Sequence, residues 1–153
     1  MTTFHRTAIT RKAVSVPMRK LVRRNVLLGR ILDYGCGRGF DVEYLHGAGF
    51  DITGYDPNGA YYDETALNKV YRTITCHYVL NVVADPLERL KIEKHIIKLL
   101  KRGGIAYITV RNDAGVADGY TSIGTWQGYV EPQKLGWTMI DNNSKSKTWY
   151  YLK

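Results

Sequence analysis

The feature that most constrains this chain is a short apolar run that leads into three glycines spaced two residues apart. Ile31–Tyr34 has the composition of a buried strand, Gly35, Gly37 and Gly39 follow it, and residues 40–46 then have a helical pattern. Such a loop lets a ligand approach the backbone, beside the free N–H groups and the positive dipole end of the helix. We therefore expect an α/β sheet with a ligand site at this loop.

The rest of the chain continues the alternation of strands and helices. Further strands are expected at residues 50–55, 73–80 and 105–110, and a helix at residues 86–101. This alternation favours a parallel sheet with right-handed crossovers and helices on both faces. Two extended runs near the end, residues 137–141 and 148–152, flank a turn-prone segment and predict an antiparallel hairpin.

Length and composition limit the class of protein. A chain of 153 residues fits one domain, and it contains no apolar run of the ~18 residues that would span a membrane. Residues 1–6 lack the apolar core of a signal peptide, so we expect a cytoplasmic protein. Two cysteines are too few for a disulfide framework or a zinc site, and no metal is expected.

Positive charge is concentrated at the N-terminus. Residues 1–32 hold eight Lys and Arg and no acid, whereas the remainder holds fourteen residues of each sign. We therefore divide the chain into a basic arm and helix at residues 1–30, with the helix starting near Ser15 and stopping near Gly29, and a ligand-binding domain at residues 31–153. Such a patch suits a polyanion, and nucleic acid bound through residues 6–30 is the first candidate. A solvated helix face that only aids solubility is the alternative.

The spacing of the loop excludes a dinucleotide-binding fingerprint, because that fingerprint needs a small residue where this chain has Phe40. The pattern is instead Asp-x-Gly-x-Gly-x-Gly, starting at Asp33. It resembles the first motif of the Rossmann-like S-adenosylmethionine-dependent methyltransferases, in which the loop wraps the methionine part of the cofactor and the acid lies near its amino group. The resemblance implies S-adenosylmethionine as cofactor and assigns to it Asp33, Tyr34, Gly35, Cys36, Gly37, Gly39, Asp56 and Pro57.

Asp56 ends the second expected strand, where the resemblance implies a carboxylate that holds both ribose hydroxyls. Its distance from the loop, about 20 residues, fits a ribose-binding acid. A turn-initiating role before Pro57 is the alternative. Only sixteen residues separate Asp56 from the strand at Thr73, where the family usually has a helix, a strand and another helix. We therefore expect a Rossmann-like, mostly parallel sheet that is abbreviated between the second and fourth family strands, and the adenine contacts stay unassigned.

A narrower resemblance concerns the methyltransferases associated with DNA phosphorothioation and their phage relatives. It covers residues 7 to about 135 and is carried by residues 7–12 with Pro17, 33–39, 78–83 with Asp85, Pro86 and Arg89, 110–111 and 119–129. For this group the fold and the cofactor are inferred more firmly than the reaction.

Methyl transfer needs few catalytic side chains, because the protein mainly aligns a nucleophile with the sulfonium methyl group. The loop after the strand at Thr73 normally faces that methyl group, and it contains Tyr78 and Asn81. Asn81 lines the methyl site or caps the next turn. The Asn/Asp-Pro-Pro-Tyr/Phe motif of amino-methylating enzymes is absent, and neither cysteine follows a proline as the cytosine-C5 nucleophile does. Cys76 and His77 are expected in the core.

Residues 119–129 are unusually rich in hydroxyl, amide and aromatic groups for a connecting loop, which suits stacking and hydrogen bonding of a base. An aromatic-anchored loop that packs on the sheet edge is the alternative. With this segment included, the predicted catalytic residues are Asn81, Tyr78, Thr125 and Gln127.

The leading hypothesis is therefore an S-adenosylmethionine-dependent methyltransferase that acts on nucleic acid. A chain this short has no room for a target-recognition domain, so we expect weak sequence selectivity or a partner protein that selects the target. The alternatives are a methyltransferase for a small molecule or a protein, and a non-catalytic S-adenosylmethionine-binding accessory or regulatory protein.

Overall fold

A computed structural model describes residues 12–61, 63–113 and 118–153 of the chain. Its centre is a six-stranded sheet with the order β2-β1-β3-β4-β8-β7, in which the first four strands run parallel and β8 is antiparallel to both its neighbours. The strands are β1 (Ile31–Tyr34), β2 (Ile52–Tyr55), β3 (Tyr71–His77), β4 (Leu100–Arg111), β7 (Thr138–Asn142) and β8 (Ser146–Leu152). The predicted fold class, including the C-terminal hairpin, is confirmed.

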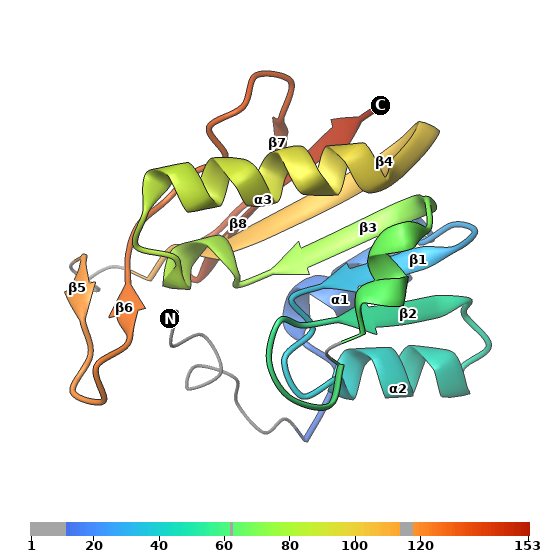
Figure 1. Cartoon of the computed structure of the whole chain (residues 1–153), viewed down its shortest axis with the longest axis horizontal. Helices are drawn as coiled ribbons and strands as arrows, with labels where there is room; N and C mark the ends of the chain where they lie inside the picture. Colours follow the sequence, from blue (N-terminus) through green and yellow to red (C-terminus); the bar gives the residue numbers. More distant parts are fainter. Residues whose placement is uncertain (1–11, 62, 114–117) are drawn as a thin grey trace.

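Helices cover both faces of the sheet (Figure 1). On one face, α1 (Val16–Arg23) and α2 (Phe40–Gly47) pack on Ile31 and Tyr107. On the other face, α3 (Pro86–Leu99) packs on Leu32 and Ile108. Neighbouring residues of one strand thus point into different cores, as the two-residue period of a strand requires.

The predicted abbreviation of the sheet is confirmed. Two short 3-10 helices, η2 (Gly59–Tyr61) and η3 (Glu64–Asn68), lead from β2 to β3, and β3 pairs directly with β1. The described residues between β2 and β3 contain no strand. The order of the strands reverses at β1, where β2 lies on one side and β3 on the other.

Three predicted boundaries are wrong for local reasons. The strand expected to reach residue 80 ends at His77, because Tyr78 adopts a left-handed φ of 60° and the chain turns into the 3-10 helix η4 (Leu80–Val82). The helix expected to stop at Gly29 ends at Arg23, two residues before Asn25, which has a φ of 52°. The helix expected to reach residue 101 ends at Leu99, and β4 begins at once at Leu100.

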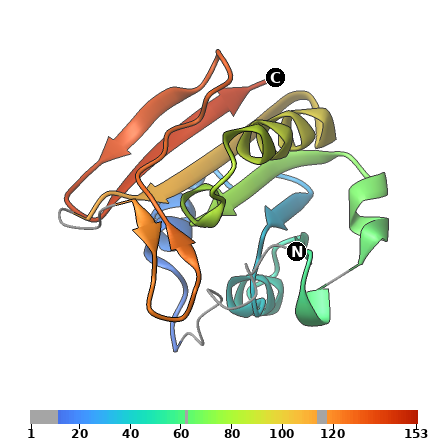
Figure 2. The same cartoon turned by 60° about the vertical axis from the view of Figure 1, so that its left-hand side comes forward.

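A small hairpin, β5 (Gly119–Tyr120) and β6 (Trp126–Gln127), forms a separate two-stranded sheet. It lies beyond the end of the main sheet at which β3 terminates (Figures 1 and 2). Gly128 donates its backbone N–H to the carbonyl of Asn81, so the hairpin is attached to η4. The unusual segment at residues 119–129 therefore lies at the carboxyl ends of the parallel strands.

In the part of the chain that the structure describes, no helix combines the length and the apolar character that crossing a membrane requires.

Candidate functional site

A cavity of about 350 Å³ lies at the carboxyl ends of the parallel strands. Its wall is formed by residues from the loop after β1, the ends of β2, β3 and β4, helix η4 and strand β6. Ligands of open α/β sheets bind at such a reversal of strand order, and small-molecule pockets usually measure roughly 300–1,000 Å³. The cavity thus has the expected place and size for a small ligand.

The glycine loop forms one side of this cavity. Gly35, Gly37 and Gly39 all have left-handed φ values of 76°, 58° and 77°. A Cβ atom on Gly35 would lie 2.4 Å from Cγ2 of Val79, so the loop packs too closely on the segment after β3 for any other residue. The loop ends at Phe40, the first residue of α2.

Asp56 lies at the end of β2 and lines the cavity. One carboxylate oxygen accepts the N–H of Gly37 at 2.8 Å, and the other accepts the N–H of Asn58 at 3.0 Å. The same side chain therefore stabilises the turn and faces the site, so the two roles considered for it are compatible. Burial raises the pKa of Asp56, although both backbone hydrogen bonds act in the opposite direction.

Of the other residues predicted to bind the cofactor, Asp33, Cys36 and Pro57 also line the cavity. Asp33 is buried and accepts a hydrogen bond from the hydroxyl of Thr75 at 2.9 Å. The pKa of Cys36 is raised, first by burial and then by the charges of Asp33 and Asp56. A raised pKa keeps this thiol protonated, so it lacks the reactivity of a thiolate.

Tyr34 is the predicted cofactor residue that the structure places elsewhere. Its ring packs in the core beside Tyr55, and its hydroxyl lies 3.0 Å from Nδ1 of His95 in α3. Burial raises its pKa. It is not among the residues that line the cavity.

Ser15 and Asp41 also line the cavity, although neither was predicted as a site residue. Ser15 caps α1 and donates both its N–H and its hydroxyl to the carboxylate of Asp41, at 2.8 and 2.5 Å. Both residues are buried. The pair joins the N-terminal helix to the first turn of α2 across 26 positions of sequence, which no local pattern reveals.

The opposite side of the cavity is formed by residues after β3 and β4 and from the hairpin. Three of the four predicted catalytic residues, Tyr78, Asn81 and Gln127, line it together. The amide Nδ2 of Asn81 donates to Oε1 of Gln127 at 3.2 Å. Thr125 does not line the cavity, because it is buried in the hairpin with its hydroxyl 2.6 Å from that of Thr121.

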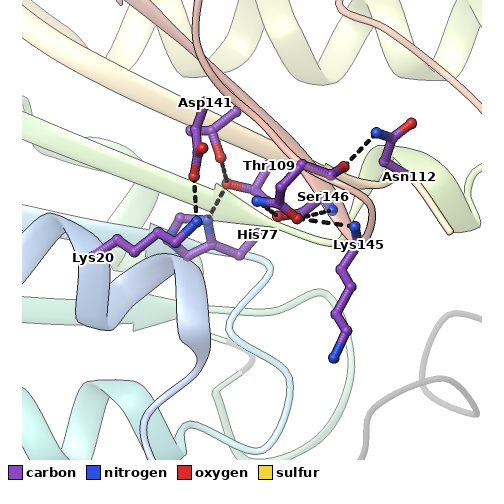
Figure 3. Close-up of polar contacts among 9 residues, drawn as sticks. Lys20, His77, Thr109, Asn112, Asp141, Lys145 and Ser146 are labelled. Carbon is purple, nitrogen blue, oxygen red and sulfur yellow. Dashed lines mark hydrogen bonds and ion pairs between the residues drawn. The ribbon is translucent and has the colours of Figure 1, made fainter.

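His77 and Arg111 complete this side. His77 was expected in the core, but it is the last residue of β3 and lines the cavity. Its Nδ1 lies 3.0 Å from the hydroxyl of Thr109 in β4 (Figure 3). The Thr109 hydroxyl lies 2.9 Å from that of Thr148 in β8. Cys76, the preceding residue, is fully buried as expected.

The chemistry of the lining fits a cationic cofactor. Asp33, Asp41 and Asp56 line the half of the cavity next to the glycine loop. Carboxylates complement the positive sulfonium and ammonium groups of S-adenosylmethionine, and Asp56 is placed as a ribose-binding acid should be. Within the described residues, no three His, Cys, Asp or Glu side chains are grouped as metal ligands would be.

Three features together are typical of the Rossmann-like S-adenosylmethionine-dependent methyltransferases: the reversal of strand order, the glycine loop and the acid at the end of β2. Residues 8–152 match the model of a family described as a methyltransferase domain. The chain belongs to this family, and the prediction of a methyltransferase enzyme is confirmed. No curated protein matches it.

Solved structures show the same fold at low identity. The 1,6-didemethyltoxoflavin-N1-methyltransferase of Burkholderia thailandensis, solved with 1,6-didemethyltoxoflavin and S-adenosylhomocysteine, matches 99% of this chain and 78% of its own at 16% identity and a TM-score of 0.66. The match with TehB from Haemophilus influenzae covers 94% of this chain and 63% of TehB, at 18% identity and a TM-score of 0.66. The match with an S-adenosylmethionine-dependent methyltransferase from Clostridium acetobutylicum covers 88% of this chain and 87% of that protein, at 13% identity and a TM-score of 0.60.

Proposed function

We propose that this methyltransferase binds S-adenosylmethionine in the cavity and transfers its methyl group to nucleic acid. The observation that carries the cofactor part is the pairing of the glycine loop with Asp56 across one cavity. Asp56 would hold the ribose, and Asp33 with the loop would hold the methionine part. When bound, the cofactor supplies an electrophilic methyl group, and the protein orients the acceptor and excludes water.

The distribution of positive charge supports a nucleic acid acceptor. Arg19, Arg23, Arg24 and Arg30 are exposed on and after α1. Lys20 has a structural role instead, since its ammonium group contacts the carboxylate of Asp141 in β7 (Figure 3). Exposed arginines of this kind bind phosphates and make affinity depend on salt. Residues 6–11 of the proposed contact lie outside the described residues.

The cofactor part is tested by calorimetry with S-adenosylmethionine and by transfer of a labelled methyl group. Asp56→Ala should abolish both binding and transfer, because it removes the ribose ligand and the brace on Gly37. Asp51→Ala is the matched control, since Asp51 is largely exposed and its ion pair with Arg30 is long, at 4.0 Å. If Asp56→Ala bound the cofactor as tightly as the control does, the assignment of this cavity would be wrong.

The acceptor part is tested by offering DNA, RNA and a cell extract depleted of nucleic acid to the enzyme together with S-adenosylmethionine that carries a labelled methyl group. We expect label in nucleic acid. Charge reversal at Arg19, Arg23 and Arg24 should weaken nucleic acid binding and reduce its dependence on salt. An unchanged salt slope would refute a role for this helix.

A small-molecule acceptor is the second candidate. It is favoured by structural neighbours named for small-molecule substrates, such as the toxoflavin-precursor enzyme and the magnesium protoporphyrin IX methyltransferase of Synechocystis. Label confined to small metabolites of the extract would establish it. Tight cofactor binding with no labelled product at all would instead indicate an accessory or regulatory protein.

We also propose kinship with the methyltransferases associated with DNA phosphorothioation and their phage relatives, a cytoplasmic location, and a partner protein that selects the target. The motifs at residues 33–39, 78–83 and 119–129 support this kinship, and residues 7–11 of the N-terminal motif lie outside the described residues. Co-purification of a second protein that confers sequence preference on methylation would test the partner.

A further inference from the structure

A groove outside the cofactor cavity lies between α1 and α2. It has a volume of about 340 Å³ and is lined by residues of both helices and of the segment before α1, among them Lys12, Val14, Arg19, Val22, Phe40 and Tyr44. Phe40 also lines the cofactor cavity, so the cavity and the groove share one side chain as a common wall. A chain molecule with one unit in the cavity can therefore place the adjoining unit in this groove.

Two aromatic rings of α2 line the groove. Phe40 and Tyr44 are four positions apart, so they lie on the same side of the helix. Phe40 is half-buried, whereas Tyr44 is 58% exposed. The half-buried valines 14 and 22 complete the apolar lining. The groove thus offers a flat ring that is open to solvent, beside an apolar wall that is fixed by the core.

The charged side chains that line the groove are both cations. Lys12 and Arg19 are exposed, and Arg19 donates one of its five N–H groups to the carbonyl of Val14 at 3.2 Å. Among the described residues, no acid lines the groove. Glu43, the exposed acid of α2, instead accepts the hydroxyl of Tyr61 in η2 at 3.0 Å. The groove is therefore suited to an anion that also has a flat apolar surface.

A nucleotide has both of these properties. Its base stacks on aromatic rings, and its phosphate is bound by Lys and Arg side chains. An apolar peptide would leave both cations without a partner, and an acidic peptide has no flat surface for the exposed ring. Charge and shape together thus favour a nucleotide as the occupant.

We propose that this groove binds the nucleotide next to the methylated one in a single-stranded nucleic acid. Its base stacks on the ring of Tyr44, and Lys12 and Arg19 hold its phosphate. The inference rests on the proposed function and adds to it a subsite outside the cofactor cavity. A single strand is required, because in a duplex the faces of the adjoining base are covered by its neighbours. Such stacking accepts any base, which agrees with weak sequence selectivity.

The experiment uses the full chain saturated with S-adenosylhomocysteine, which permits no reaction. Three fluorescently labelled probes of equal length are compared: a short single strand, the corresponding abasic strand, which keeps every phosphate, and the duplex. Fluorescence anisotropy at several salt concentrations gives the affinity and its salt slope. Calorimetry with S-adenosylhomocysteine checks that each variant still folds and binds the cofactor product.

We expect Tyr44→Ala to weaken binding of the single strand by about tenfold, as the loss of one stacked base should, and to leave binding of the abasic strand and the duplex unchanged. Tyr44→Phe keeps the ring and should lose less than about threefold. Lys12→Gln and Arg19→Gln should each reduce the salt slope for the single strand by about 0.7, the value for one phosphate. Lys101→Gln, at an exposed position near the amino end of β4, is the matched control and should leave the slope unchanged.

The failures of the groove and of the proposed function are distinguishable. If Tyr44→Ala binds the single strand as tightly as Tyr44→Phe does, or weakens all three probes equally, the inference is overturned and nucleic acid methylation is left intact. If the unaltered protein binds S-adenosylhomocysteine but none of the nucleic acid probes, the proposed acceptor is wrong and this inference with it. Binding to vesicles of phosphatidylglycerol and phosphatidylcholine that requires Tyr44, without binding to the single strand, would assign the groove to a membrane surface and overturn the inference.

Discussion

Glu93 is a carboxylate with no exposed surface, and it holds two backbone groups from a distant part of the chain. It lies in α3, and its two oxygens accept the N–H groups of Gln133 and Lys134 at 2.7 and 2.8 Å. These residues belong to the segment that leads from the β5–β6 hairpin to β7. One buried side chain thus attaches this connection to the helix.

Glu93→Gln keeps the shape of the side chain but leaves only one accepting oxygen. One backbone N–H then faces the buried amide NH₂ of the new glutamine, so two donors meet without an acceptor, which costs about 1–3 kcal/mol. We expect the free energy of unfolding to fall by about 2 kcal/mol. For a chain of this length that corresponds to a decrease in Tm of roughly 4–8 °C. Urea titration followed by the fluorescence of the three tryptophans measures it.

Glu131→Gln is the matched control on the same segment. Its carboxylate is 66% exposed and lies 3.3 Å from the ammonium group of Lys147, so it should contribute ~1 kcal/mol or less. If Glu93→Gln unfolded at the same urea concentration as this control, the two backbone hydrogen bonds would not have the stabilising role assigned to them here.

Two further predictions concern pH and the wall of the cavity. Burial and the charge of Lys98 lower the pKa of His95 from its ordinary value of 6.5, so the unfolded chain binds the proton more strongly and stability should fall as pH drops below 6.5. His95→Gln should reduce the dependence of the urea midpoint on pH between pH 7.5 and 5.5, and an unchanged dependence would contradict this. Ser15→Ala removes the cap of α1 and the hydroxyl contact to Asp41, so we expect a loss of about 1–2 kcal/mol in urea unfolding and weaker cofactor binding by calorimetry, whereas Ser15→Thr should preserve both.

Local pattern was sufficient for much of the fold and for the cofactor side of the site. The strand–loop–helix at residues 31–47 could be predicted because it depends on backbone rules that act over a few residues. The acid at Asp56 could be predicted from its resemblance to the ribose-binding carboxylate of the family. The missing strand could be predicted because sixteen residues cannot hold a helix, a strand and another helix. The end of β3 could not, since Tyr78 has the composition of a strand residue but adopts a left-handed φ.

The tertiary structure alone decided which side chains meet across the cavity. Ser15 reaches Asp41 over 26 positions and Asn81 reaches Gln127 over 46, and no periodicity within either segment encodes such a contact. It likewise placed Tyr34 in the core. The sequence by itself determined the class of ligand, because its glycine loop and the acid at the end of the next strand resemble those of the S-adenosylmethionine-dependent methyltransferases. The acceptor side depends on how the hairpin packs on η4, and that packing is a property of the whole folded chain.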